Sequence, residues 1–180
     1  KIMNVLKSTS VALLFSVALI SMPSMAQNSN PPQLTDPEIA SVAVTANQID
    51  VEYGKIALKK TKNAALRKFA QTMIDDHTSI IDQAVTLAKK LGVTPKDNAV
   101  TQSLLDGAKT TTQTLNSKKG NDFERAYIDN EVSYHEAVIS TVKNVLIPET
   151  QNAQLKELLQ SVMPLLEHHL EMAKMAQSNL

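Results

Sequence analysis

Four histidines are the side chains in this sequence best suited to chemistry, and three of them share helical spacing with apolar residues. His77, His135 and His169 each fall on the apolar stripe of a segment with a period near 3.6 residues. His168 falls beside the stripe, and we expect it near the surface. Because the three stripe positions belong to three separate segments, a helical fold would bring three imidazoles into one interior.

Acidic residues accompany these histidines. Glu131 precedes His135 by one helical turn, so both side chains project from the same face. Asp76 directly precedes His77 and is expected about 100° round the helix, at the edge of the stripe. Glu52 lies between apolar positions of an earlier segment, and we expect it to border the core.

This set of donors suits a metal ion. Imidazole and carboxylate groups together bind zinc, iron or manganese when they converge from different helices. We therefore predict one transition metal ion at the centre of the protein. The predicted ligands are Glu52, His77, Glu131, His135 and His169. Asp76 is predicted to orient an imidazole from outside the ligand set.

Two other interpretations fit the same residues. Glu131 with His135, or Asp76 with His77, would serve equally as buried polar pairs in a structural or stress-related protein that binds no metal. A metal-dependent oxidase or a peroxide-removing enzyme is the second alternative. The sequence contains no Gly-rich phosphate loop, no His-Glu-x-x-His and no G-x-S-x-G motif, so serine and phosphoryl chemistry have no support. We expect a binding protein more than an enzyme.

The elements that must position these residues are all helical. Apolar periodicity predicts long helices over 37–61, 64–91, 121–146 and 151–178, with a weaker helix over 98–117. Pro148 is expected to end the third long helix, and Pro164 to kink the fourth and thereby aim His169. The fold class is therefore all-α, a four-helix bundle. Its long connection over 92–120 predicts the crossover found in ferritin-like folds, with an extra helix in it.

Charge and composition exclude several partners. The chain has 18 basic and 18 acidic residues and no cysteine. A near-neutral surface argues against nucleic acid or anionic lipid as the main partner. Without cysteine there are no disulfides and no thiolate ligands. A homo-oligomer or a protein partner stays open.

The beginning of the sequence is typical of an exported protein. Lys1 and Lys7 precede an apolar run over 11–20, and Ser24 and Ala26 supply small residues for a signal peptidase. We predict a signal peptide over 1–26, cleaved near Ala26, a disordered leader over 27–35 and one domain over 36–180. The apolar run is too short to cross a membrane, so we expect a periplasmic or otherwise exported protein with no span after cleavage.

Three motifs carry a resemblance to a known family. They are Phe69-Ala70-x-x-Met73-x-x-Asp76-His77, Phe123-x-x-x-Tyr127-Ile128 followed by His135-Glu136, and Met163-Pro164-Leu165-Leu166-x-x-His169-Leu170. Together they resemble the domain-of-unknown-function family numbered 4142 (DUF4142), a ferritin-like family of exported bacterial proteins. The resemblance covers about 36–178.

The resemblance implies a left-handed bundle of four long helices with an extra helix in the crossover. It also implies that Glu52, Asp76, His77, His135 and His169 are the family's characteristic polar positions. Ferritin-like di-iron proteins carry Glu-x-x-His on two helices. Here Ile74, Val132 and Leu166 stand three residues before the histidines, which argues against a di-iron oxidase or an iron store.

Overall fold

Residues 33–180 are described by a computed structural model, and within that range the chain is helical with no strand. Its helices are α1 (Asp36–Lys60), α2 (Ala64–Leu91), α3 (Ala99–Ser117), α4 (Gly120–Thr141), the π-helical turn η1 (Val142–Leu146), α5 (Ile147–Glu149) and α6 (Ala153–Ser178). The all-α prediction is confirmed, and all five predicted helices are present.

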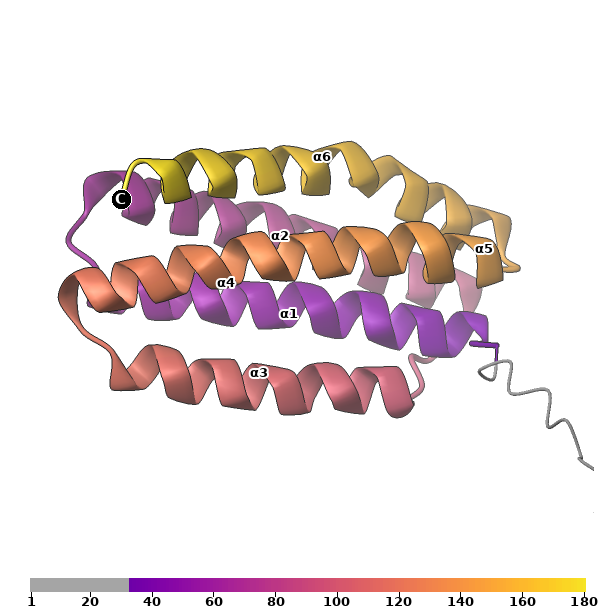
Figure 1. Cartoon of the computed structure of the whole chain (residues 1–180). Coiled ribbons are helices and arrows are strands. Elements are labelled where there is room, and N and C mark those ends of the chain that lie inside the picture. Colours follow the sequence, from indigo (N-terminus) through magenta and orange to yellow (C-terminus); the bar gives the residue numbers. More distant parts are fainter. Residues whose placement is uncertain (1–32) are drawn as a thin grey trace, which may run out of the picture. The chain divides into compact units, whose positions relative to one another are not determined.

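Four long helices form the bundle, and α3 lies outside it. Figure 1 shows that α1 and α2 are antiparallel, that α4 and α6 are antiparallel, and that α2 and α4 run in the same direction. The connection from α2 to α4 must therefore return along the length of the bundle, and it does so as α3, which packs on α1. This is the predicted four-helix bundle with a helix in its crossover.

Asparagine caps begin three of the helices. Asn63, Asn98 and Asn152 each accept hydrogen bonds from two backbone N–H groups of the following turn, which have no partner within the helix. Helix α2 ends at Gly92, whose φ of 65° is the left-handed conformation that glycine adopts without strain. These boundaries agree closely with those expected from sequence.

The start of α4 has no side-chain cap. Asn121 and Glu124 have the sequence spacing of a capping box, but α4 begins at Gly120 and its N-cap residue is Lys119. The Glu124 carboxylate instead accepts a hydrogen bond from the Thr61 hydroxyl, which lies in the loop between α1 and α2. The Glu124 side chain therefore makes a tertiary contact with Thr61 instead of capping its own helix.

Pro148 does not end the helix that contains it. The backbone stays helical from α4 through η1 and α5 to Glu149, so the predicted end near 146 is wrong. In η1 the N–H of Ile147 donates to the carbonyl of Val142, five residues earlier. This wider turn keeps the chain helical next to a proline that lacks an N–H group. Pro164 likewise lies within continuous helix in α6.

The core has two parts on either side of the histidines. One, here called the aromatic half, lies toward the loop between α1 and α2 and consists of Ile49, Tyr53, Ala57, Leu66, Phe69, Ala70, Met73, Leu115, Phe123, Tyr127, Ile128, Val132 and Ala173. The other, here called the aliphatic half, consists of Ile39, Val42, Val142, Leu146, Leu155, Leu159 and Leu166.

The predicted signal peptide and most of the predicted leader lie outside the described residues. Leu34 and Thr35, which we assigned to the leader, belong to the folded part. The Leu34 N–H donates to a Glu149 carboxylate oxygen at 2.7 Å, and Thr35 forms a capping box with Glu38 at the start of α1. No helix within 33–180 is long and apolar enough to span a membrane.

Candidate metal centre

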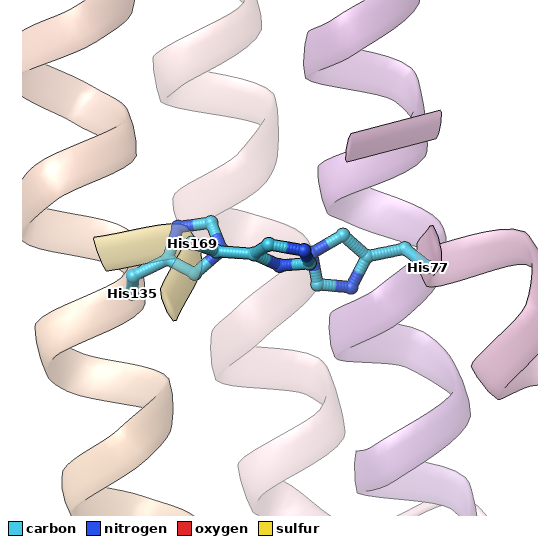
Figure 2. Close-up of side chains that lie close together, drawn as sticks. All are labelled: His77, His135 and His169. Atoms are coloured by element: carbon cyan, nitrogen blue, oxygen red, sulfur yellow. The ribbon is translucent and has the colours of Figure 1, made fainter. Parts of the chain in front are cut away.

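Three imidazoles meet in the interior, midway along the bundle. His77 comes from α2, His135 from α4 and His169 from α6, and their side chains are 3%, 1% and 0% exposed. The ring centroids are 5.1 to 5.6 Å apart. Figure 2 shows the rings pointing toward one another from separate helices. One nitrogen of each ring lies within 4.8 Å of a nitrogen of each other ring.

The orientation of His77 is set by an asparagine on α1. His77 Nδ1 lies 2.7 Å from Asn47 Oδ1. The Asn47 amide nitrogen donates to the Ala43 carbonyl at 2.8 Å, so the amide oxygen must be the atom that faces the ring. Because that oxygen only accepts, Nδ1 carries the proton and Nε2 keeps its lone pair.

The other two rings are also oriented by a hydrogen bond from one ring nitrogen to an oxygen acceptor. His135 Nδ1 donates to the Glu131 carbonyl at 2.9 Å, one turn earlier in α4. His169 Nε2 donates to Asp76 Oδ2 at 2.9 Å, a hydrogen bond that joins α6 to α2. Asp76 therefore orients His169 and not its sequence neighbour His77. Each acceptor fixes one tautomer and leaves the second ring nitrogen as a lone pair.

The second nitrogen of every ring lacks a partner. His77 Nε2, His135 Nε2 and His169 Nδ1 are buried without a hydrogen bond. Buried polar atoms are nearly always paired, and an unpaired one costs about 1 to 3 kcal/mol. Three unpaired lone pairs in one interior thus require an explanation.

A fourth donor, which the sequence analysis missed, comes from α1. Asp50 is fully buried, and its Oδ2 lies 3.4 Å from His77 Nε2 and 3.6 Å from His135 Nε2. Neither carboxylate oxygen has a hydrogen-bond partner. Asp50 thus occupies the position in the core that we assigned to Glu52.

Glu52 lies on the surface. Its side chain is 63% exposed and pairs with Lys55 at 2.7 Å, so the prediction that it borders the core is wrong. The helical spacing contained a signal for the correct residue. Asp50 follows Ala46 by four residues and precedes Tyr53 by three, which places it on the inner face. Glu52 is two residues further on, nearly opposite.

Glu131 is the second buried carboxyl group at the site. Its side chain is 0% exposed, both oxygens lack partners, and Oε2 lies 3.7 Å from His135 Nδ1. Carboxylate oxygens of Glu131 and Asp50 and a nitrogen of His135 lie within 4.8 Å of one another. The predicted placement of Glu131 beside His135 in the core is correct.

Burial determines the protonation states. Burial raises the pKa of Asp50 to about 8, and burial followed by the charge of Asp50 raises the pKa of Glu131 well above its usual value. Burial and the neighbouring imidazoles lower the pKa of His77 well below its usual value, and burial lowers the pKa of His135 to about 4. Burial also lowers the pKa of His169, although Asp76 opposes this. The imidazoles are therefore neutral at physiological pH.

The fourth histidine is separate from this group. His168 is exposed, as expected from its position beside the apolar stripe. It lies on the same helix as His169, so a substitution at His168 is a suitable control for substitutions of the buried histidines.

Fold and site together define a class of protein: an all-α bundle whose centre contains three histidines and two carboxyl groups from four helices. The family model described as "Domain of unknown function (DUF4142)" matches residues 21–176. The chain belongs to this family, as its three motifs predicted.

One solved structure extends the comparison of the fold. The structure described as "CopM in the Cu(II)-bound form" matches with a TM-score of 0.61 and 18% sequence identity, covering 81% of this chain and 98% of that chain. At this identity the likeness concerns the fold alone. No curated protein sequence matches the chain.

Proposed function

We propose that the protein binds one divalent transition metal ion at the bundle centre. The ligand atoms are His77 Nε2, His135 Nε2, His169 Nδ1 and a carboxylate oxygen of Asp50. A single observation carries the proposal: each imidazole has one nitrogen fixed by an acceptor and the other buried without a partner. Metal-binding histidines characteristically have this arrangement, because the outer hydrogen bond sets the tautomer that coordinates.

The protonation states support the same conclusion. A metal ligand must be deprotonated, and burial already keeps the three imidazoles neutral. Asp50 would lose its proton to the bound ion, whose positive charge offsets the burial of the carboxylate. Glu131 would stay protonated beside it and serve as a neutral neighbour.

The donor set narrows the choice of metal. Three imidazoles and one carboxylate suit zinc, copper(II) and iron(II) better than calcium or magnesium. The usual order of stability places copper(II) first for nitrogen and oxygen donors. The Cu(II)-bound state of CopM supports including copper with zinc, iron and manganese in the test.

A polar core that only fixes helix register is the alternative without metal. In that case the histidines and acids should pair with one another. Only Asp76 forms such a pair among the acids beside these rings, with His169. The two buried carboxyl groups do not: Glu131 Oε2 is 3.7 Å from His135 Nδ1, and Asp50 Oδ2 is 3.4 Å from the nearest imidazole nitrogen, His77 Nε2. The metal proposal explains these separations, since an ion would lie between the donors. Export to the periplasm remains a prediction.

Metal content is the direct test. The protein would be purified without an affinity tag and analysed for transition metals, then stripped and titrated with zinc, copper(II), iron(II) and manganese(II). We expect about one equivalent, with His77→Ala and His135→Ala losing it. Two matched controls should keep it: His168→Ala removes an exposed histidine, and Glu52→Gln removes an exposed acid.

Stability separates the proposal from the polar-core alternative. Bound metal stabilises the folded state by mass action, so each tightly bound ion should raise the melting temperature of the native sequence but not of His77→Leu. His77→Leu also replaces a buried polar ring with an apolar side chain and should remain folded. No bound metal, together with an unchanged melting temperature in all four titrations, would exclude the proposed site.

A further inference from the structure

A cavity extends from the candidate metal centre into the aliphatic half. Its volume is about 320 Å³, and its wall is formed mostly by apolar side chains of α1, α2, α3, α4 and α6. Protein interiors are usually packed without voids much larger than a water molecule. A cavity of this size is about twice the engineered apolar cavity of about 150 Å³ that admits benzene.

The sequence creates this space with alanines. On the inner faces of the helices, small side chains stand where the aromatic half has tyrosine and phenylalanine. Those lining the cavity are Ala40, Ala43 and Ala46 of α1, Ala84 and Ala88 of α2, Ala108 of α3, and Ala137 of α4. The apolar stripe of α2 continues through Ala84, Leu87 and Leu91, yet none of the three is fully buried.

A group of polar residues lines the cavity at the candidate metal centre: Asn47, Asp50, His77, Tyr134 and His135. Among them, Asp50, His77 and His135 carry buried oxygen and Nε2 atoms that have no hydrogen-bond partner. An apolar wall with a few convergent polar groups is the usual form of a small-molecule site.

A second groove lies between α2 and α6. It is lined by residues including Gln83, Lys90 and Glu157, and it shares Leu87 and Leu158 with the cavity. These two leucines are therefore the wall between the groove and the interior. Both are partly exposed, and movement of their side chains would open a path from solvent.

From this geometry we propose that the cavity binds a slender apolar molecule of about ten carbon atoms with one polar group, the size following from the benzene comparison. The apolar part lies among the alanines and leucines, and the polar group faces Asp50 and the histidines. The apolar contact does not depend on a bound metal ion. The inference therefore goes beyond the proposed metal site and can fail separately from it.

A chain-length series tests the inference. Linear primary alcohols from hexanol to hexadecanol would be titrated calorimetrically into the full chain, both metal-free and metal-loaded. We expect affinity to rise about fourfold per added methylene until the cavity is full, near ten carbons, and then to stop rising or fall. The same limit is expected in both metal states, and metal content is measured on the same samples.

Variants on one helix provide matched controls. Ala84→Phe should fill the cavity and weaken decanol binding at least about tenfold. Val85→Phe places the same ring on the adjacent, exposed position and should leave binding unchanged. Ala43→Leu narrows the cavity from α1 and should shift the limit to a shorter chain. Affinity that keeps rising to hexadecanol, equal loss in both phenylalanine variants, or no binding of any alcohol would overturn the inference.

Discussion

The two halves of the core differ in how densely they are packed, although α1 and α6 contribute buried residues to both. In the aromatic half, Phe69 and Phe123 each contact Tyr127 with ring centroids 6.1 to 6.2 Å apart. In the aliphatic half, alanines surround a cavity of about 320 Å³. The comparison suggests that one half supplies rigidity and the other supplies space, with the histidines between them.

The close approach of α1 and α2 illustrates the dense packing beside the aromatic half. A Cβ atom at Gly54 would lie 2.9 Å from Ile74 Cγ1 and 3.0 Å from the Ala70 carbonyl oxygen. Only a residue without a side chain lets the two helices come this near. The aromatic half can therefore fix the position of α2, which carries His77, against α1. A site with fixed imidazoles requires such support.

The largest expected difference between the halves comes from removing side chains. Phe123→Ala should lower the free energy of unfolding by about 4 kcal/mol, because Phe123 is fully buried and its loss leaves a cavity. Leu158→Ala, at the partly exposed wall of the aliphatic half, should cost about 1 kcal/mol. Urea denaturation measures both. Equal losses would mean that the halves are packed alike.

Larger side chains should be tolerated beside the cavity but not where α1 packs closely on α2. Gly54→Leu forces α1 away from α2 and should destabilise the metal-free protein by about 3 kcal/mol. Ala84→Leu adds atoms beside the cavity and should change the free energy of unfolding by less than about 1 kcal/mol. A destabilised Ala84→Leu would show that the aliphatic half has no usable space.

The boundary between the halves should respond to pH in the metal-free protein. Asp50 is flanked by His77 of α2 and by Glu131 and His135 of α4. With its pKa raised to about 8, folded Asp50 keeps a proton that the unfolded chain releases near pH 4, so stability should fall as pH rises. The imidazoles, whose pKa values are lowered, act in the opposite direction but only below about pH 6.5.

The loss due to Asp50 between pH 6.5 and pH 8 should be about 1.5 kcal/mol. Asp50→Asn has nearly the same shape and does not titrate, so it should reduce this slope. Urea denaturation at several pH values, in the presence of a chelator, measures the effect. An identical slope in Glu52→Gln and the native sequence is the control, because Glu52 is exposed.

The smallest expected effect concerns a glycine with open space around it. A Cβ atom at Gly107, on α3, would meet nothing within 4 Å. Gly107→Ala should therefore stabilise the protein by about 0.8 kcal/mol through helix propensity alone. Gly54→Ala should not, because the same methyl group meets Ala70 and Ile74. Thermal unfolding of the two variants compares them directly, and a stabilised Gly54→Ala would contradict the tight packing of α1 on α2.

The histidines of the candidate site were predictable because each belongs to a strong local pattern. His77, His135 and His169 share the stripe of their own helix, and the stripe must face the core. Glu131 was predictable for the same reason, one turn from His135. The carboxylate of α1 was not found, because the choice between Asp50 and Glu52 depends on which side of α1 meets the other helices. Helix α1 packs on α2, α3 and α4, so its apolar stripe is broad and its centre is poorly defined by sequence.

By itself, the sequence determined the helices, the long crossover and the set of buried imidazoles, because periodicity, caps and glycine stops act within a few residues. Tertiary structure alone decided that Asp76 orients His169 and that Asn47 orients His77. It also decided that Glu124 binds Thr61 instead of capping α4, and that alanines from four helices line one cavity. These features join residues far apart in the chain. Their distances follow from how the helices pack against one another, which no local pattern of residues specifies.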